Sequence, residues 1–171
     1  TLPVVAGNVV ADPAQDVLKL AVVERYGKNG NIGLTFVRGF GLRRGALASS
    51  VAHDHHNIIV AGADETDMAA CVRAIADMQG GLAIAAGGQV LGRLPLPIAG
   101  LLSEAPVEEV IGGLELLTAI AHELGCALPA PFMTISFISL PTVPELGLTD
   151  RGLISVRDHA LISTFVEQAA R

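Results

Sequence analysis

The chain has 171 residues, 51% of them hydrophobic and 16% charged, with a formal net charge of −6. This length supports one well-formed hydrophobic core, so we expect a single domain over residues 1–171. The 11 Lys and Arg residues are scattered along the sequence. The charge therefore argues against a nucleic-acid binder, which needs clustered positive side chains.

The apolar composition predicts that part of the surface faces another domain or subunit. Glycine, proline or a charge interrupts every long apolar run before the roughly 20 residues that a membrane-spanning helix needs, so we expect no membrane partner. Cys71 and Cys126 lie far apart in helix-like segments and are predicted to be buried free thiols. No signal-peptide pattern follows Thr1, which predicts a cytoplasmic location, and the missing initial Met suggests a processed or excised segment.

The first half of the chain predicts four strands and a helix. Residues 17–24 and 32–36 are expected to pair as a hairpin across the turn-forming segment 28–31. Residues 46–52 and 57–61 are two further apolar runs. Asp64 is a typical helix N-cap, and apolar side chains recur at helical spacing from Met68 to Met78.

The second half predicts two more strands over 82–86 and 90–96, joined by a glycine turn. A helix is expected to begin at Pro106 and end at Gly125, and a last short helix to span 158–166. The order of elements predicts an α+β fold: a mixed, mostly antiparallel β-sheet packed with two or three helices.

The segment most dense in reactive side chains is His53-Asp54-His55-His56-Asn57. It places three imidazoles, a carboxylate and an amide between apolar runs that are predicted to be buried. Buried polar groups need bonding partners or a ligand, so this segment is the first candidate for a functional site.

Three interpretations of this segment stay open on the residues alone. His53 and His55 would share one face of a strand and could chelate a transition metal, but a complete site needs a further ligand, and His122 and His159 are isolated. The segment could instead line an active site without a metal. It could also be a structural cluster that locks a turn through side-chain to backbone bonds.

Four separated segments resemble one known family. They are residues 22–33, 48–62, 94–104 and 131–141, and they occur in the same order as in the C-terminal domain of bacterial adenine deaminases. Those enzymes belong to the amidohydrolase superfamily and hydrolyse adenine to hypoxanthine and ammonia.

The resemblance implies a preceding (β/α)8 barrel that holds divalent manganese, iron or zinc, where a metal-bound hydroxide attacks C6 of adenine. Such a barrel needs roughly 250 residues and is absent from this chain. We therefore expect this domain to complete or cap the active site of a barrel from the same enzyme, to bind no cofactor, and to be inactive when isolated.

The resemblance also selects residues within the histidine segment. The family pattern is His-Asp-Ser-His-Asn, which His53, Asp54, His56 and Asn57 match and His55 does not. These four are predicted to be substrate-pocket or interdomain contacts, because Asn, Asp and His suit the ring nitrogens and amine of adenine. His53 and His55 remain as metal candidates, and no residue is assigned a catalytic role.

Lys28 and Asn29 are predicted as a second contact site near the barrel mouth. The expected partners are the barrel, adenine and further copies of the chain in a homo-oligomer. Two alternatives remain: a free-standing ligand-binding or oligomerisation module without catalysis, and a small metallohydrolase that uses the histidine segment itself.

Overall fold

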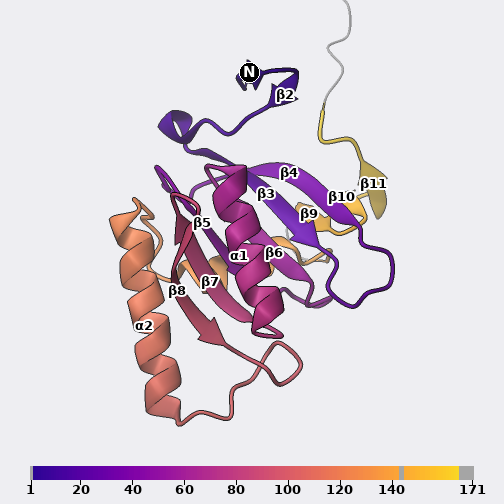
Figure 1. Cartoon of the computed structure of the whole chain (residues 1–171). Coiled ribbons are helices and arrows are strands. Elements are labelled where there is room, and N and C mark those ends of the chain that lie inside the picture. Colours follow the sequence, from indigo (N-terminus) through magenta and orange to yellow (C-terminus); the bar gives the residue numbers. More distant parts are fainter. Residues whose placement is uncertain (1, 143–144, 166–171) are drawn as a thin grey trace, which may run out of the picture.

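The computed structural model describes residues 2–142 and 145–165. Its centre is a six-stranded sheet in the order β4-β3-β6-β5-β7-β8, in which every neighbouring pair is antiparallel (Figure 1). The strands are β3 (Val17–Val23), β4 (Ile32–Arg38), β5 (Ala46–Ser49), β6 (Ile58–Gly62), β7 (Gly81–Ala86) and β8 (Gln89–Pro95). The predicted α+β class is confirmed, with an antiparallel rather than a mixed central sheet.

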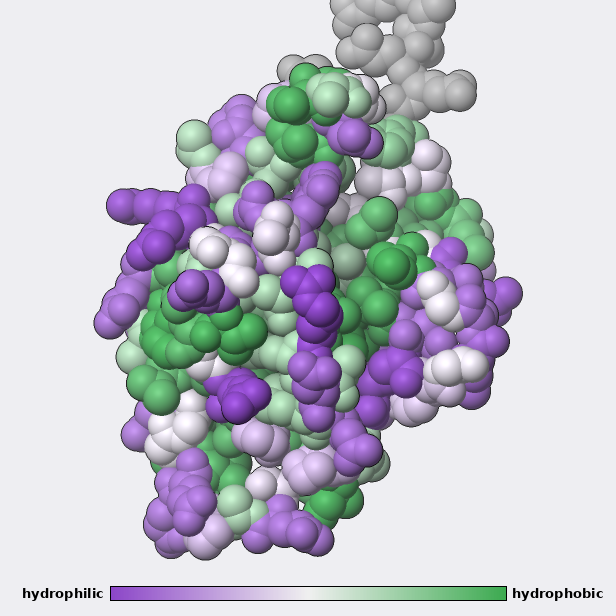
Figure 2. All heavy atoms as spheres, viewed as in Figure 1, coloured by the Kyte–Doolittle hydropathy of each residue, from purple (hydrophilic) through white to green (hydrophobic). Residues whose placement is uncertain are grey.

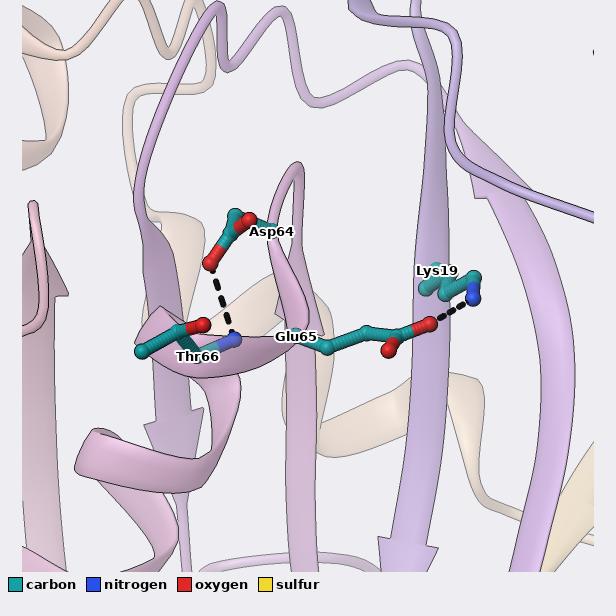
Figure 3. Close-up of polar contacts among 4 residues, drawn as sticks. All are labelled: Lys19, Asp64, Glu65 and Thr66. Atoms are coloured by element: carbon teal, nitrogen blue, oxygen red, sulfur yellow. Dashed lines mark hydrogen bonds and ion pairs between the residues drawn. The ribbon is translucent and has the colours of Figure 1, made fainter. Parts of the chain in front are cut away.

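Helix α1 (Glu65–Asp77) covers one face of this sheet over β5 to β8. The Asp64 carboxylate caps it as predicted, accepting a hydrogen bond from the backbone N–H of Thr66 at 2.8 Å (Figure 3). It also accepts one from the backbone N–H of Asp67 at 3.2 Å. Met68, Cys71 and Ile75 are buried against the sheet at helical spacing. The capping residue and the apolar stripe therefore fix both the start and the buried face of α1.

The opposite face is covered by several elements. Helix α2 (Val107–Glu123) packs on β8, and α3 (Pro131–Ile138) packs on β5 and β6. Strands β9 (Leu146–Thr149) and β10 (Gly152–Ser155) lie against β4 and form a second antiparallel sheet with β11 (Ala160–Ile162). Gly33 permits this approach, because a Cβ there would overlap the Thr149 carbonyl.

An N-terminal arm precedes the central sheet and contains β1 (Val4–Val5), β2 (Asn8–Val9) and a 3₁₀ turn, η1 (Pro13–Gln15). No helix within the described ranges is both long enough and apolar enough to cross a membrane. Cys71 and Cys126 are buried free thiols, as predicted. Burial raises the pKa of Cys71 to about 12.

Two local predictions need correction, and one helix was missed. The helix expected over 158–166 is wrong where the structure describes it, because Ala160–Ile162 forms β11; Val166 lies outside the described residues. Helix α3 was not predicted. The run 46–52 is a strand only as far as Ser49, and the next strand begins at Ile58 rather than Asn57.

Candidate functional site

The histidine segment is a loop and not a strand. Residues 53–55 form a turn between β5 and β6, and His56 has a left-handed φ of 49°. The His56 N–H donates to the Ala52 carbonyl at 2.7 Å, and the His53 N–H donates to the Ser136 carbonyl of α3 at 2.9 Å. The expectation that His53 and His55 share one face of a strand is therefore wrong.

The histidine side chains have different surroundings. The His53 ring packs against Phe137 of α3, with ring centroids 4.6 Å apart, and meets the His56 ring edge-on at 5.9 Å. His55 lines a cavity of about 390 Å³ together with Asp54, Asp150 and Arg151. Asp54 is exposed at this cavity, so its carboxylate is open to a ligand or partner.

The pKa values of His55 and His56 are both lowered from the ordinary imidazole value. Burial is the largest cause that lowers the pKa of His55, although the Asp150 carboxylate acts in the opposite direction. Desolvation also lowers the pKa of His56, and the neighbouring His53 adds to this shift. His55 Nε2 and His56 Nδ1 are enclosed without a hydrogen-bond partner among the described residues. Each ring therefore has one enclosed nitrogen without a partner among these residues.

Asn57 is buried, at 4% exposure, and its amide is bonded at both ends. Its Nδ2 donates to Asp150 Oδ1 at 3.2 Å, and its Oδ1 accepts a long bond from the Arg25 N–H at 3.4 Å. The Asn57 N–H also donates to His55 Nδ1 at 3.1 Å. These contacts join the histidine segment to the β9–β10 turn and to the end of β3, so Asn57 positions the segment from within the domain.

Arg25 and Tyr26 connect the two segments that sequence analysis selected separately. Arg25 Nε donates to the His56 carbonyl, and its Nη2 donates to the Ala99 carbonyl. The Tyr26 hydroxyl lies 3.1 Å from the His55 carbonyl and 3.2 Å from that of His56. Neither residue was predicted. The sequence feature that could have identified them is their position directly before the Gly27–Gly30 turn, inside the first segment that resembles the family.

Glu24 shapes the loop that presents Lys28 and Asn29. Its carboxylate accepts hydrogen bonds from the backbone N–H groups of Tyr26, Lys28, Asn29 and Gly30 at 2.6 to 3.4 Å. Desolvation acts against the shift, but these amide bonds together lower the pKa of the Glu24 carboxyl. The Lys28 ammonium lies 5.8 Å from the centre of the Tyr26 ring. Lys28 and Asn29 are exposed beside a cavity of about 780 Å³.

The two candidate segments thus meet at one end of the central sheet. We call this region the loop end and define it as residues 24–31, 50–57 and 96–102. Over residues 2–142 and 145–165, no group of three or more His, Cys, Asp or Glu side chains is arranged to hold a metal ion. The loop end offers imidazoles, an exposed carboxylate and a lysine, which suit hydrogen bonding to a polar ligand.

Comparison with known proteins assigns this α+β domain to a class of deaminase domains. The sequence model of the adenine deaminase C-terminal domain matches residues 1–160. The chain is 60% identical over 166 residues to an adenine deaminase of Desulforamulus reducens, a match that covers 97% of this chain and 28% of that protein. It is 57% identical to an adenine deaminase of Desulfatibacillum aliphaticivorans (93% of this chain, 28% of that protein) and 50% identical to one of Methanococcoides burtonii (94% and 28%).

The chain belongs to the adenine deaminase C-terminal domain family, which confirms the family resemblance. It spans a little over a quarter of the length of the curated relatives that it matches. Those relatives therefore contain further protein in the same polypeptide. Residues 2–142 and 145–165 do not form the metal-binding barrel expected from the resemblance.

Proposed function

We propose that this domain acts within an adenine deaminase, which converts adenine and water to hypoxanthine and ammonia, and that its loop end completes or caps the active site. The names of the relatives support the reaction, and their greater length supports a catalytic part elsewhere in the polypeptide. That part would be the amidohydrolase barrel, with adenine as substrate.

A divalent metal ion in the barrel, whether manganese, iron or zinc, would supply the activated hydroxide. The described residues of this chain do not fit such an ion, since none of their His, Cys, Asp and Glu side chains form a metal-binding group. The histidine segment would instead bind and orient adenine. The exposed Asp54 carboxylate and the half-buried His56 ring can bond to a purine or to the barrel.

One observation carries this proposal. Arg25 and Tyr26 bond to the backbone carbonyls of His55 and His56, so the Lys28 loop and the histidine segment form one unit although about 30 residues separate them. Backbone bonds of this kind fix the loop geometry while leaving the side chains of His56 and Lys28 free. A preorganised polar surface is what a substrate-contacting cap requires.

Activity measurements on two polypeptides test the proposal. Adenine deamination, followed as ammonia release, is measured for the 171-residue chain and for a full-length adenine deaminase that carries it as C-terminal domain. We expect activity in the full-length protein alone. Metal-dependent activity in the 171-residue chain would contradict the proposal and support the metallohydrolase alternative.

We further propose a cytoplasmic homo-oligomer. Buried free thiols suit a reducing compartment, and exposed apolar side chains such as Met133 and Phe137 suit subunit contacts. Sedimentation of the full-length protein tests the oligomer, and a monomer at micromolar concentration would contradict it.

A further inference from the structure

An apolar groove lies beside α1 on the sheet face formed by β3 and β4. Its volume is about 590 Å³, its floor includes Ala21, Ile32 and Leu34, and its wall includes Ala69 and Val72 of α1. Ile32 and Leu34 are 56% and 59% exposed. Figure 2 shows the hydrophobic side chains gathered over β3 and β4, to the right of α1. We call this surface the β4 groove.

The groove exists because α1 packs over β5 to β8 and leaves the β3–β4 part of the same face open. At the first turn of α1, Glu65 reaches across to Lys19 of β3 in an ion pair (Figure 3). Both residues of this pair line the groove, and the apolar floor beside them stays exposed. An exposed apolar surface of this kind is typical of an interface.

The β4 groove is continuous with the loop end. Val23 and Val72 line both the groove and the 780 Å³ cavity beside Lys28 and Asn29. A molecule seated in the groove would therefore extend along β3 to Lys28 and Asn29.

The opposite end of the groove is formed by segments close to the two ends of the chain. Asn8 and Val9 of the N-terminal arm line it, together with Thr164 and Phe165. The Thr164 hydroxyl donates to the Leu34 carbonyl at 3.0 Å. In Figure 1 the N-terminal arm lies at the top of the molecule, above β3 and β4.

We propose that the β4 groove binds the part of the adenine deaminase polypeptide that precedes this domain. This inference rests on the proposed function. The matched relatives carry most of their length outside this C-terminal domain, and a preceding part would join the chain at the N-terminal arm, beside the groove. Packing along β3 then leads the same part to the loop end. One docking face thus accounts for the exposed apolar floor and for the exposed Lys28 and Asn29 beside it.

Cysteine labelling tests this inference. Leu34→Cys places a thiol on the groove floor at an exposed position, so the substitution leaves the core intact. The native thiols of Cys71 and Cys126 are buried and their pKa values are raised, so they give a low background with maleimide. Glu115→Cys is the matched control, because it is exposed on α2, which packs on β8 at the other edge of the sheet.

We expect the introduced thiol of Leu34→Cys to react quickly in the 171-residue chain. In a full-length adenine deaminase carrying this domain, the same thiol should react at least about tenfold more slowly. Glu115→Cys should react at similar rates in both proteins. Equal rates at position 34 would overturn the inference. Protection that rises with the concentration of the 171-residue chain would also overturn it, because the occupant would then be a second copy.

The labelling experiment can fail without contradicting the proposed function. A full-length protein that deaminates adenine but labels quickly at position 34 removes the groove inference alone. Circular dichroism of each variant, with a cooperative thermal transition, confirms that the labelled protein is folded. An Ile32→Cys variant repeats the measurement at a second exposed position on the groove floor.

Discussion

The loop end and the β4 groove are neighbouring surfaces that are built in opposite ways. Hydrogen bonds from Arg25, Tyr26 and Asn57 to backbone and carboxylate groups hold the loop end. The floor of the groove is ordinary strand whose outward side chains, Ile32 and Leu34, contribute little buried area. Polar substitutions should therefore affect folding at the loop end, whereas apolar substitutions in the groove should affect association and not folding.

The largest effect within this comparison is expected at Asn57. Asn57→Ala removes the bonds to Asp150 and to the Arg25 N–H and leaves buried polar groups unsatisfied. We expect the free energy of unfolding to fall by about 2 kcal/mol. Urea denaturation of the 171-residue chain measures this loss. Asn31→Ala, at an exposed position, is the control and should change stability by less than about 0.5 kcal/mol. Equal stability of the two variants would contradict the role given to Asn57.

A smaller loss is expected at Arg25. Arg25→Lys keeps the charge but cannot reproduce the planar fork that reaches the carbonyls of His56 and Ala99. The free energy of unfolding should fall by about 1 kcal/mol, since the bonds are only partly buried. Arg73→Lys on the exposed face of α1 serves as the matched control in the same denaturation series. A loss as large for Arg73→Lys would show that the effect is not specific to the loop end.

Leu34 should show almost no effect on folding. Leu34→Ala on the groove floor is expected to change the free energy of unfolding by less than about 0.5 kcal/mol, because the side chain is 59% exposed. The same substitution at fully buried Leu47 of β5 should cost about 3 kcal/mol. A loss above about 1 kcal/mol for Leu34→Ala would mean that the groove is part of the folding core.

The pH dependence is the smallest expected effect. Burial lowers the pKa of His55 in the folded chain below its ordinary value of 6.5, so the unfolded chain binds this proton more readily. The stability that depends on neutral His55 is fully present above pH 6.5. It decreases as the pH falls below 6.5, until the pKa of His55 in the folded chain is reached. Urea denaturation from about pH 7.5 to about 5.5 measures the slope. His55→Gln should reduce this slope, and an unchanged slope would contradict the assignment.

Much of the fold could be predicted because its signals are local. Asp64 and the apolar spacing that follows specify α1, and Pro106 marks the start of α2. Pro131 in the first turn of helix α3 is a start signal, but the β-branched and aromatic residues that follow and the missing side-chain cap weaken the helical pattern. The segment at Ala160 pairs with β10, and this pairing overrides the helical pattern.

The candidate site could be predicted only in part. The density of polar side chains identified the histidine segment, and the family resemblance added the Lys28 loop. Their joining by Arg25 and Tyr26 could not be predicted, because it depends on β3 and β6 being neighbours in the sheet. Asp150 lies 93 residues from Asn57 and reaches it only through the β9–β10 turn. Contacts between residues so far apart in the chain cannot be predicted from the pattern of a single sequence.

His56→Asn in a full-length adenine deaminase carrying this domain tests the central claim most directly. Asn tolerates the left-handed backbone of His56, so the imidazole is removed with little strain. His159→Asn is the matched control, since His159 is exposed in a distant turn with a φ of 51°. We expect kcat/KM for adenine to fall about 100-fold for His56→Asn and to stay unchanged for His159→Asn, with equal thermal stability. Wild-type kcat/KM in both variants would contradict the claim that the loop end completes the active site.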